Sequence, residues 1–153
     1  MKRNTQTHES NMTKSNISLL SAFALFVLVA PARADDQKEI QGAWKIEKAV
    51  RGGQDMPAEE REKTTLEFKG SKAIVHHGAS GEKPAEFTLD SAAKPKSIVI
   101  KPENEQKELL GIYELKGDTL KICLGRDGAD RPKDFESKEG SKSMLLILKR
   151  EKK

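Results

Sequence analysis

Short stretches of alternating apolar and polar residues, separated by turns roughly every ten residues, run along the chain from residue 42 to residue 149. Alternation with a period of two places the apolar side chains on one face, which is typical of a half-buried strand. Many short strands with almost no helix predict an antiparallel sandwich or barrel. We expect about eight strands, over residues 42–50, 64–69, 72–77, 85–90, 97–101, 109–115, 119–124 and 143–149.

The connections between these strands are mostly short, which favours up-and-down neighbours. The clearest hairpin signal is the turn at residues 116–118, between two of the expected strands. Closing eight such strands into a barrel removes both sheet edges and can leave room for one small ligand. We therefore predict an all-β, antiparallel, up-and-down eight-stranded barrel with one short surface helix. That helix is expected after Pro57, and Asp36 and Glu39 have the spacing of a capping box for a further short turn.

The first 34 residues have the features of a signal peptide. An apolar run at residues 17–30 follows basic residues and precedes Ala32-Arg33-Ala34, a small-x-small cleavage site. The run is shorter than the roughly 20 residues that a membrane-spanning helix needs. We expect cleavage after Ala34, no membrane span in the mature chain, and a single periplasmic or secreted domain over residues 35–153.

The charge balance changes when this leader is set aside. Four of the 28 Lys and Arg residues lie in the leader, together with one of the 24 Asp and Glu residues, so the rest of the chain is close to neutral. Its charges of both signs are interspersed, as on an ordinary soluble surface, whereas nucleic-acid binding needs clustered cations. We therefore expect a monomer whose partner is a small apolar ligand or an envelope protein, and not a nucleic acid.

The residues that most often carry chemistry do not form a recognisable set. His76 and His77 are neighbours on an expected strand and point to opposite faces, so they cannot both bind one metal. Cys123 is the only cysteine, and we expect a small buried hydrophobe, with a reactive thiol as the alternative. The acidic cluster at residues 59–63 lacks the apolar neighbours that would raise a carboxyl pKa. We expect no enzyme, no metal and no cofactor; catalytic partners distant in the sequence are the remaining alternative.

Three stretches together resemble one family of exported domains. Residues 40–45 (Ile-Gln-Gly-Ala-Trp-Lys) are similar to its opening, residues 110–123 to its central hairpin, and residues 131–135 with 146–150 to its ending. The family is expanded in planctomycete bacteria and has no assigned activity. The resemblance covers essentially the whole mature chain.

The Gly-x-Trp start also resembles the lipocalin signature. This resemblance implies a lipocalin-like barrel in which Trp44 plugs the closed end. It further implies that an arginine near the last strand stacks on the indole ring, and Arg150 is the position that matches. A cation over an aromatic face stabilises a protein by roughly 0.5–2 kcal/mol, depending on desolvation.

The aromatic residues expected to face inward are candidates for a binding pocket. Trp44, Phe68, Phe87 and Tyr113 either fill the barrel or line an apolar ligand site. In the second case the connection at residues 51–63 would act as a lid, with Met56 as an adaptable apolar contact.

These observations lead to one functional hypothesis and one alternative. The first is an exported, non-catalytic binding module that holds a small apolar ligand inside the barrel. The alternative is a structural or protein-interaction domain with a filled core, which acts through surface loops such as residues 125–140. Phe135, in that loop, is expected to fold back over an end of the core, with contact to a partner as the other interpretation.

Overall fold

The computed structural model describes residues 33–152, so nearly all of the expected leader lies outside the described residues. The strands are β1 (Gly42–Arg51), β2 (Gln54–Asp55), β3 (Thr64–Lys69), β4 (Lys72–His77), β5 (Glu82–Asp90), β6 (Ser97–Pro102), β7 (Leu109–Lys116), β8 (Thr119–Gly125) and β9 (Ser143–Arg150). The helices are α1 (Arg33–Glu39), α2 (Ala58–Glu62) and the 3-10 turn η1 (Gly78–Ser80). None of the described helices is long and apolar enough to span a membrane.

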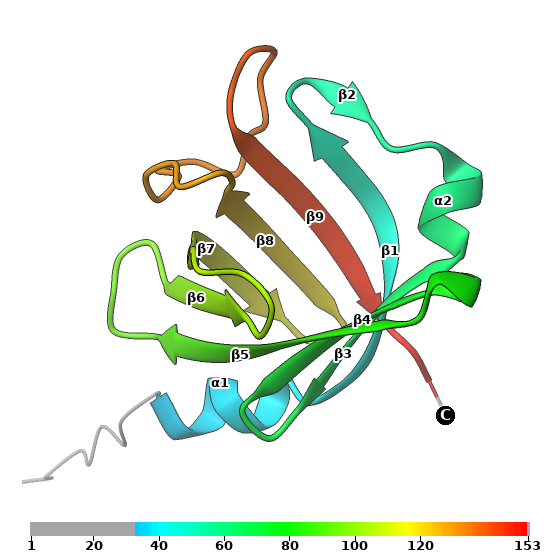
Figure 1. Ribbon diagram of the computed structural model, residues 1–153. Coiled ribbons are helices and arrows are strands. Elements are labelled where there is room, and N and C mark those ends of the chain that lie inside the picture. The colour runs from blue at the N-terminus through cyan, green and yellow to red at the C-terminus, as the bar shows by residue number, and fades with distance from the viewer. Residues whose placement is uncertain (1–32, 153) are drawn as a thin grey trace, which may run out of the picture.

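Eight of these strands form a closed antiparallel barrel (Figure 1). The order is β1-β3-β4-β5-β6-β7-β8-β9, and β9 returns to pair with β1. The two-residue β2 pairs with the last two residues of β1, beyond the stretch where β1 pairs with β3. The predicted lipocalin-like, up-and-down barrel is therefore confirmed.

Along the strands, every second side chain faces the interior of the barrel, as the alternation predicted. The most deeply buried inner side chains include Trp44, Phe68, Ile98, Tyr113, Leu120, Ile122 and Leu148. Phe68 and Phe87 meet edge to face, with ring centroids 4.9 Å apart. Such a pair contributes about 0.5–1.5 kcal/mol beyond its area burial. The half of the barrel that contains Phe68 and Phe87 is therefore filled by side chains.

A β-bulge in β1 corrects one detail of the predicted pattern. Ile46 pairs with Leu148 and Lys48 pairs with Ile147, so Glu47 is the extra residue. One inserted residue reverses the alternation that follows it. Ala49 is consequently buried inside the barrel. The sequence pattern placed Val50 on the inner face with Ile46, and this was wrong.

The strand β5 begins three residues earlier than expected, and it includes Pro84. The Pro84 carbonyl accepts a hydrogen bond from Glu103, so its nitrogen faces the same side of β5. The pairing of β5 with β6 ends at Ala85, opposite Pro102. The missing N–H of Pro84 therefore faces no strand, and this position tolerates proline.

The helix α1 closes one end of the barrel, where Figure 1 shows it below the sheet. Trp44 is fully buried there and donates from Nε1 to the Ile40 carbonyl at 2.8 Å. The Arg150 guanidinium lies 4.2 Å from the centre of the Trp44 ring. Arg150 also donates to the main-chain oxygens of Gln41 at 2.8 Å and Glu39 at 2.6 Å. One arginine thus joins the last strand, the tryptophan and the end of α1.

A second connection holds α1 against β7. Asp36 is buried, and its Oδ2 accepts hydrogen bonds from Tyr113 Oη at 2.5 Å and from Lys96 Nζ at 2.7 Å. Burial first, and then the bond to Asp36, raise the pKa of Tyr113 well above its ordinary value. The Tyr113 hydroxyl is therefore fixed as a proton donor that anchors the helix.

Candidate functional site

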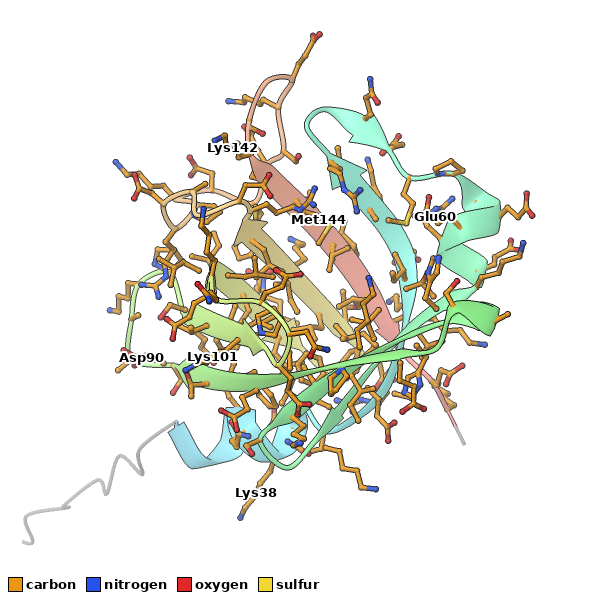
Figure 2. The ribbon with its side chains drawn as sticks, viewed as in Figure 1. Lys38, Glu60, Asp90, Lys101, Lys142 and Met144 are labelled. Atoms are coloured by element: carbon orange, nitrogen blue, oxygen red, sulfur yellow. The ribbon has the colours of Figure 1, made fainter. Side chains whose placement is uncertain are left out.

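The barrel contains a cavity of about 440 Å³ at the end opposite α1. The residues around it lie at the end of β1 and β4 and at the start of β3, β5 and β9. Figure 2 shows Met144 between β9 and β1, and Glu60 on α2. The volume falls within the range of small-molecule pockets, which is roughly 300–1,000 Å³.

The wall of this cavity is apolar. Its side chains come from β1, β3, β4, β9 and the connection before α2, and they are Ile46, Met56, Leu66, Val75, Met144, Leu146 and Leu148. Ile46, Met56, Val75 and Met144 are only partly buried, although they pack against the core. Their remaining exposed surface faces a space that side chains do not fill. Two of the seven are methionines, whose flexible thioethers adapt to irregular shapes.

The rim of the cavity is polar. Its residues are Arg51, Glu60, Thr64, His77, Ser80 and Lys83. The Thr64 hydroxyl donates to the Glu60 main-chain oxygen at 2.8 Å and lies 2.7 Å from His77 Nδ1. A hydroxyl has one proton, so Nδ1 must be the donor in the second bond. A neutral His77 then keeps its acceptor lone pair on Nε2.

Met56 separates this cavity from a second hollow of about 410 Å³ on the outer side of β1, and it borders both. The hollow lies where the pairing of β1 with β3 has ended and α2 packs against β1 instead. Arg61 donates there to the main-chain oxygens of Met56, at 3.2 Å, and of Glu47, the bulge residue. The connection at residues 51–63, expected as a lid, thus lies beside the cavity and contributes Met56, Glu60 and Arg51 to it.

The structure separates the other candidate ligand-binding residues from this cavity. Trp44, Phe68, Phe87 and Tyr113 are buried in the filled half of the barrel and do not line the open space. Of the five candidates, Met56 alone borders it.

Sequence reasoning missed the polar rim, because its signals are local and weak. Arg51 follows the bulge, and only the changed alternation places it opposite Met144 on the inner face. Lys83 precedes Pro84 and is expected in a loop, but it lies in β5 and pairs with Val75 of β4. Neither position is marked in the sequence, because the bulge reverses the face of Arg51 and Pro84 obscures the start of β5.

The long connection between β8 and β9 covers the outer surface of the barrel. Cys123 is fully buried beneath it, and its thiol donates to the Glu136 carbonyl at 3.4 Å. Burial raises the pKa of the Cys123 thiol. Phe135 is half-buried on the same side, with Lys121 Nζ 5.8 Å from its ring centre, so it packs outside the barrel. Phe135 therefore does not cover an end of the core, contrary to the expectation from the sequence.

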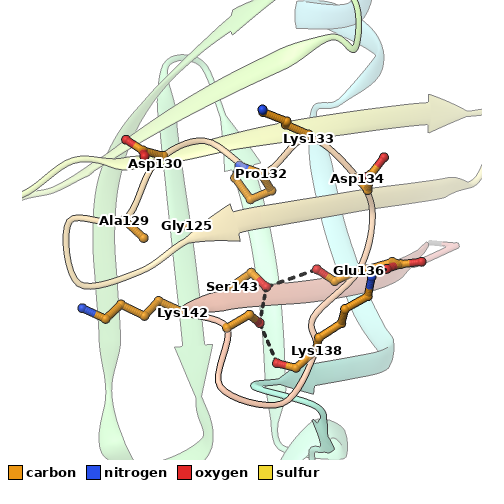
Figure 3. Close-up of a pocket in the computed structure, with 11 residues that line it drawn as sticks. Gly125, Ala129, Asp130, Pro132, Lys133, Asp134, Glu136, Lys138, Lys142 and Ser143 are labelled. Carbon is orange, nitrogen blue, oxygen red and sulfur yellow. Dashed lines mark hydrogen bonds and ion pairs between the residues drawn. The ribbon is translucent and has the colours of Figure 1, made fainter.

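A shallow hollow of about 270 Å³ lies within this connection (Figure 3). Its charged lining residues are three lysines and three acids: Lys133, Lys138, Lys142, Asp130, Asp134 and Glu136. The dashed lines in Figure 3 join Ser143 and Ser141 to each other and to main-chain oxygens of the loop. The balance of charges gives this hollow no preference for ligands of one sign.

The two histidines point to opposite faces of β4. His76 contacts Glu67 at 3.1 Å and Glu82 at 3.2 Å, whereas His77 contacts Thr64. Over residues 33–152, no three His, Cys, Asp or Glu side chains are grouped so that they could hold a metal ion.

Neither a protein-family model, nor a curated protein, nor a solved structure matches this chain.

Proposed function

We propose that the protein is an exported, non-catalytic binding module, which holds a small apolar ligand in the open half of its barrel. The observation that carries this proposal is the 440 Å³ cavity with seven apolar side chains on its wall. A barrel packed to the usual density would have closed this space with larger residues. Here the aromatic side chains gather at the end closed by α1, and the opposite end is left open.

The arrangement of polar groups supports a binding role over a catalytic one. Thr64 and His77 are close enough for nucleophile and base, but the Thr64 proton is given to the Glu60 carbonyl. His77 Nδ1 therefore donates to the hydroxyl and cannot accept its proton in this arrangement. Cys123 lies outside the barrel wall with a raised pKa, which disfavours the thiolate.

Binding can be tested with a neutral apolar dye, Nile red, and a pair of adjacent substitutions. Val75 faces the cavity and Ile74, its neighbour on β4, faces outward. We expect the dye to bind the wild-type protein and Ile74→Phe with equal affinity. Val75→Phe fills the cavity and should weaken binding by tenfold or more.

Two results would contradict the proposal. One is a dye affinity that is unchanged by Val75→Phe in a folded protein. The other is saturable hydrolysis of a small ester that disappears in His77→Gln, because this would assign chemistry to the Thr64–His77 pair. Export is tested separately, by sequencing the amino terminus of the protein recovered from its native envelope; an intact leader would contradict it.

A further inference from the structure

Two cations on the cavity rim have no acidic partner among residues 33–152. Arg51 lies opposite Met144 and Lys83 lies opposite Val75, so both side chains start on the inner face of the barrel. Within the described part of the chain, neither forms a side-chain hydrogen bond or an ion pair. Inward positions of a barrel strand usually hold apolar side chains, so two charged side chains at such positions are unusual.

Three of the nearby acids contact other side chains. Asp55 contacts Lys48 at 4.0 Å, Glu59 contacts Lys63 at 2.6 Å, and Glu82 contacts His76 at 3.2 Å. Of the described residues that line the cavity, Glu60 alone carries a carboxylate. The rim therefore has an excess of positive charge, although residues 35–153 as a whole are nearly neutral.

We infer that the cavity takes an amphiphile with an apolar body and a single carboxylate head group, and that Arg51 and Lys83 hold the head group at the rim. This inference rests on the proposed binding function. The seven apolar side chains would contact the body of the ligand. A guanidinium matches a carboxylate with two parallel hydrogen bonds, and an ammonium adds a point charge.

The test compares three probes that share a ten-carbon chain: decanoate, 1-decanol and decyltrimethylammonium. Affinities are measured by displacement of Nile red, below the concentration at which each probe aggregates. We expect decanoate to bind about tenfold more tightly than decanol, and the ammonium probe to bind most weakly. Raising the salt concentration to 0.5 M should reduce the advantage of decanoate, because salt screens charges at an exposed rim.

Substitutions assign the preference to the two cations. Arg51→Gln and Lys83→Gln should each weaken decanoate binding by roughly three- to tenfold and leave decanol binding unchanged. Lys101→Gln, on an exposed position of β6 away from the cavity, is the matched control and should change neither affinity. Arg51→Glu should reverse the preference between decanoate and the ammonium probe.

The outcomes separate this inference from the function on which it rests. Equal binding of decanoate and decanol, or equal weakening of both by the rim substitutions, overturns the carboxylate assignment and leaves apolar binding in place. If none of the probes displaces the dye and the dye itself does not bind, the proposed function fails as well.

Discussion

Replacing Arg150 should destabilise the closed end of the barrel by about 2–3 kcal/mol. The guanidinium stacks on Trp44, which is worth about 0.5–2 kcal/mol. It also donates to two carbonyls, and charge-assisted hydrogen bonds contribute about 1.5–3 kcal/mol each when buried. The Arg150 side chain is 26% exposed and water can replace part of each bond, so the sum must be reduced.

The assay is urea unfolding of Arg150→Met, followed by the fluorescence of Trp44, the only tryptophan. Methionine keeps the stem above the ring but removes the charge and the donors. For a domain of this size, the expected loss of stability in Arg150→Met corresponds to a fall of about 10 °C in Tm when the protein is unfolded by heat. Arg150→Lys should lose about half as much, because one ammonium cannot reach both carbonyls. Lys101→Met is the control, and a loss no larger than its own would refute the account of the closed end.

Three further predictions concern groups on and inside the barrel wall. Tyr113→Phe should cost about 1–2 kcal/mol at neutral pH, because Asp36 loses a donor. The raised pKa of Tyr113 means that its contribution is present below about pH 10 and is lost above it, so urea titrations should show the wild-type advantage shrinking there; a constant difference would contradict this. Cys123 should react with a thiol reagent only on unfolding, and prompt labelling of the folded protein would show that the covering loop opens. Gly111→Ala should lower stability by 2 kcal/mol or more in a thermal melt, because a Cβ there would lie 2.6 Å from Leu124; a melt within a degree or two of the wild type would contradict that close approach.

Much of the barrel could be predicted from the sequence, because each strand carries its own signal. The alternation in β8, for example, places Leu120, Ile122 and Leu124 on one face, and these three side chains are buried in the core. The short turn after Lys116 fixes the neighbouring hairpin. These features depend on contacts that are close in sequence, so local patterns are sufficient to find them.

The cavity could not be predicted in the same way. It depends on which inner side chains leave space after all eight strands have closed, and this is a property of packing. The bulge at Glu47 has no mark in the local pattern, yet it turns Arg51 toward the cavity. The buried aromatic residues were natural candidates for ligand contact, but Tyr113 and Trp44 instead bond to α1. The sequence pattern indicates that these aromatic side chains lie inside the barrel, but it does not indicate which end of the barrel they occupy.

The pairing of β1 with β9 has a consequence for how the chain is made. The first and last strands of the barrel are neighbours, so the growing polypeptide cannot complete its hydrogen-bonded ring until residues 143–150 leave the ribosome. Until then both outer strands offer unpaired main-chain groups to any passing polypeptide. A version of the chain cut short before residue 143 would lack β9, and the seam between β1 and β8 would stay open permanently.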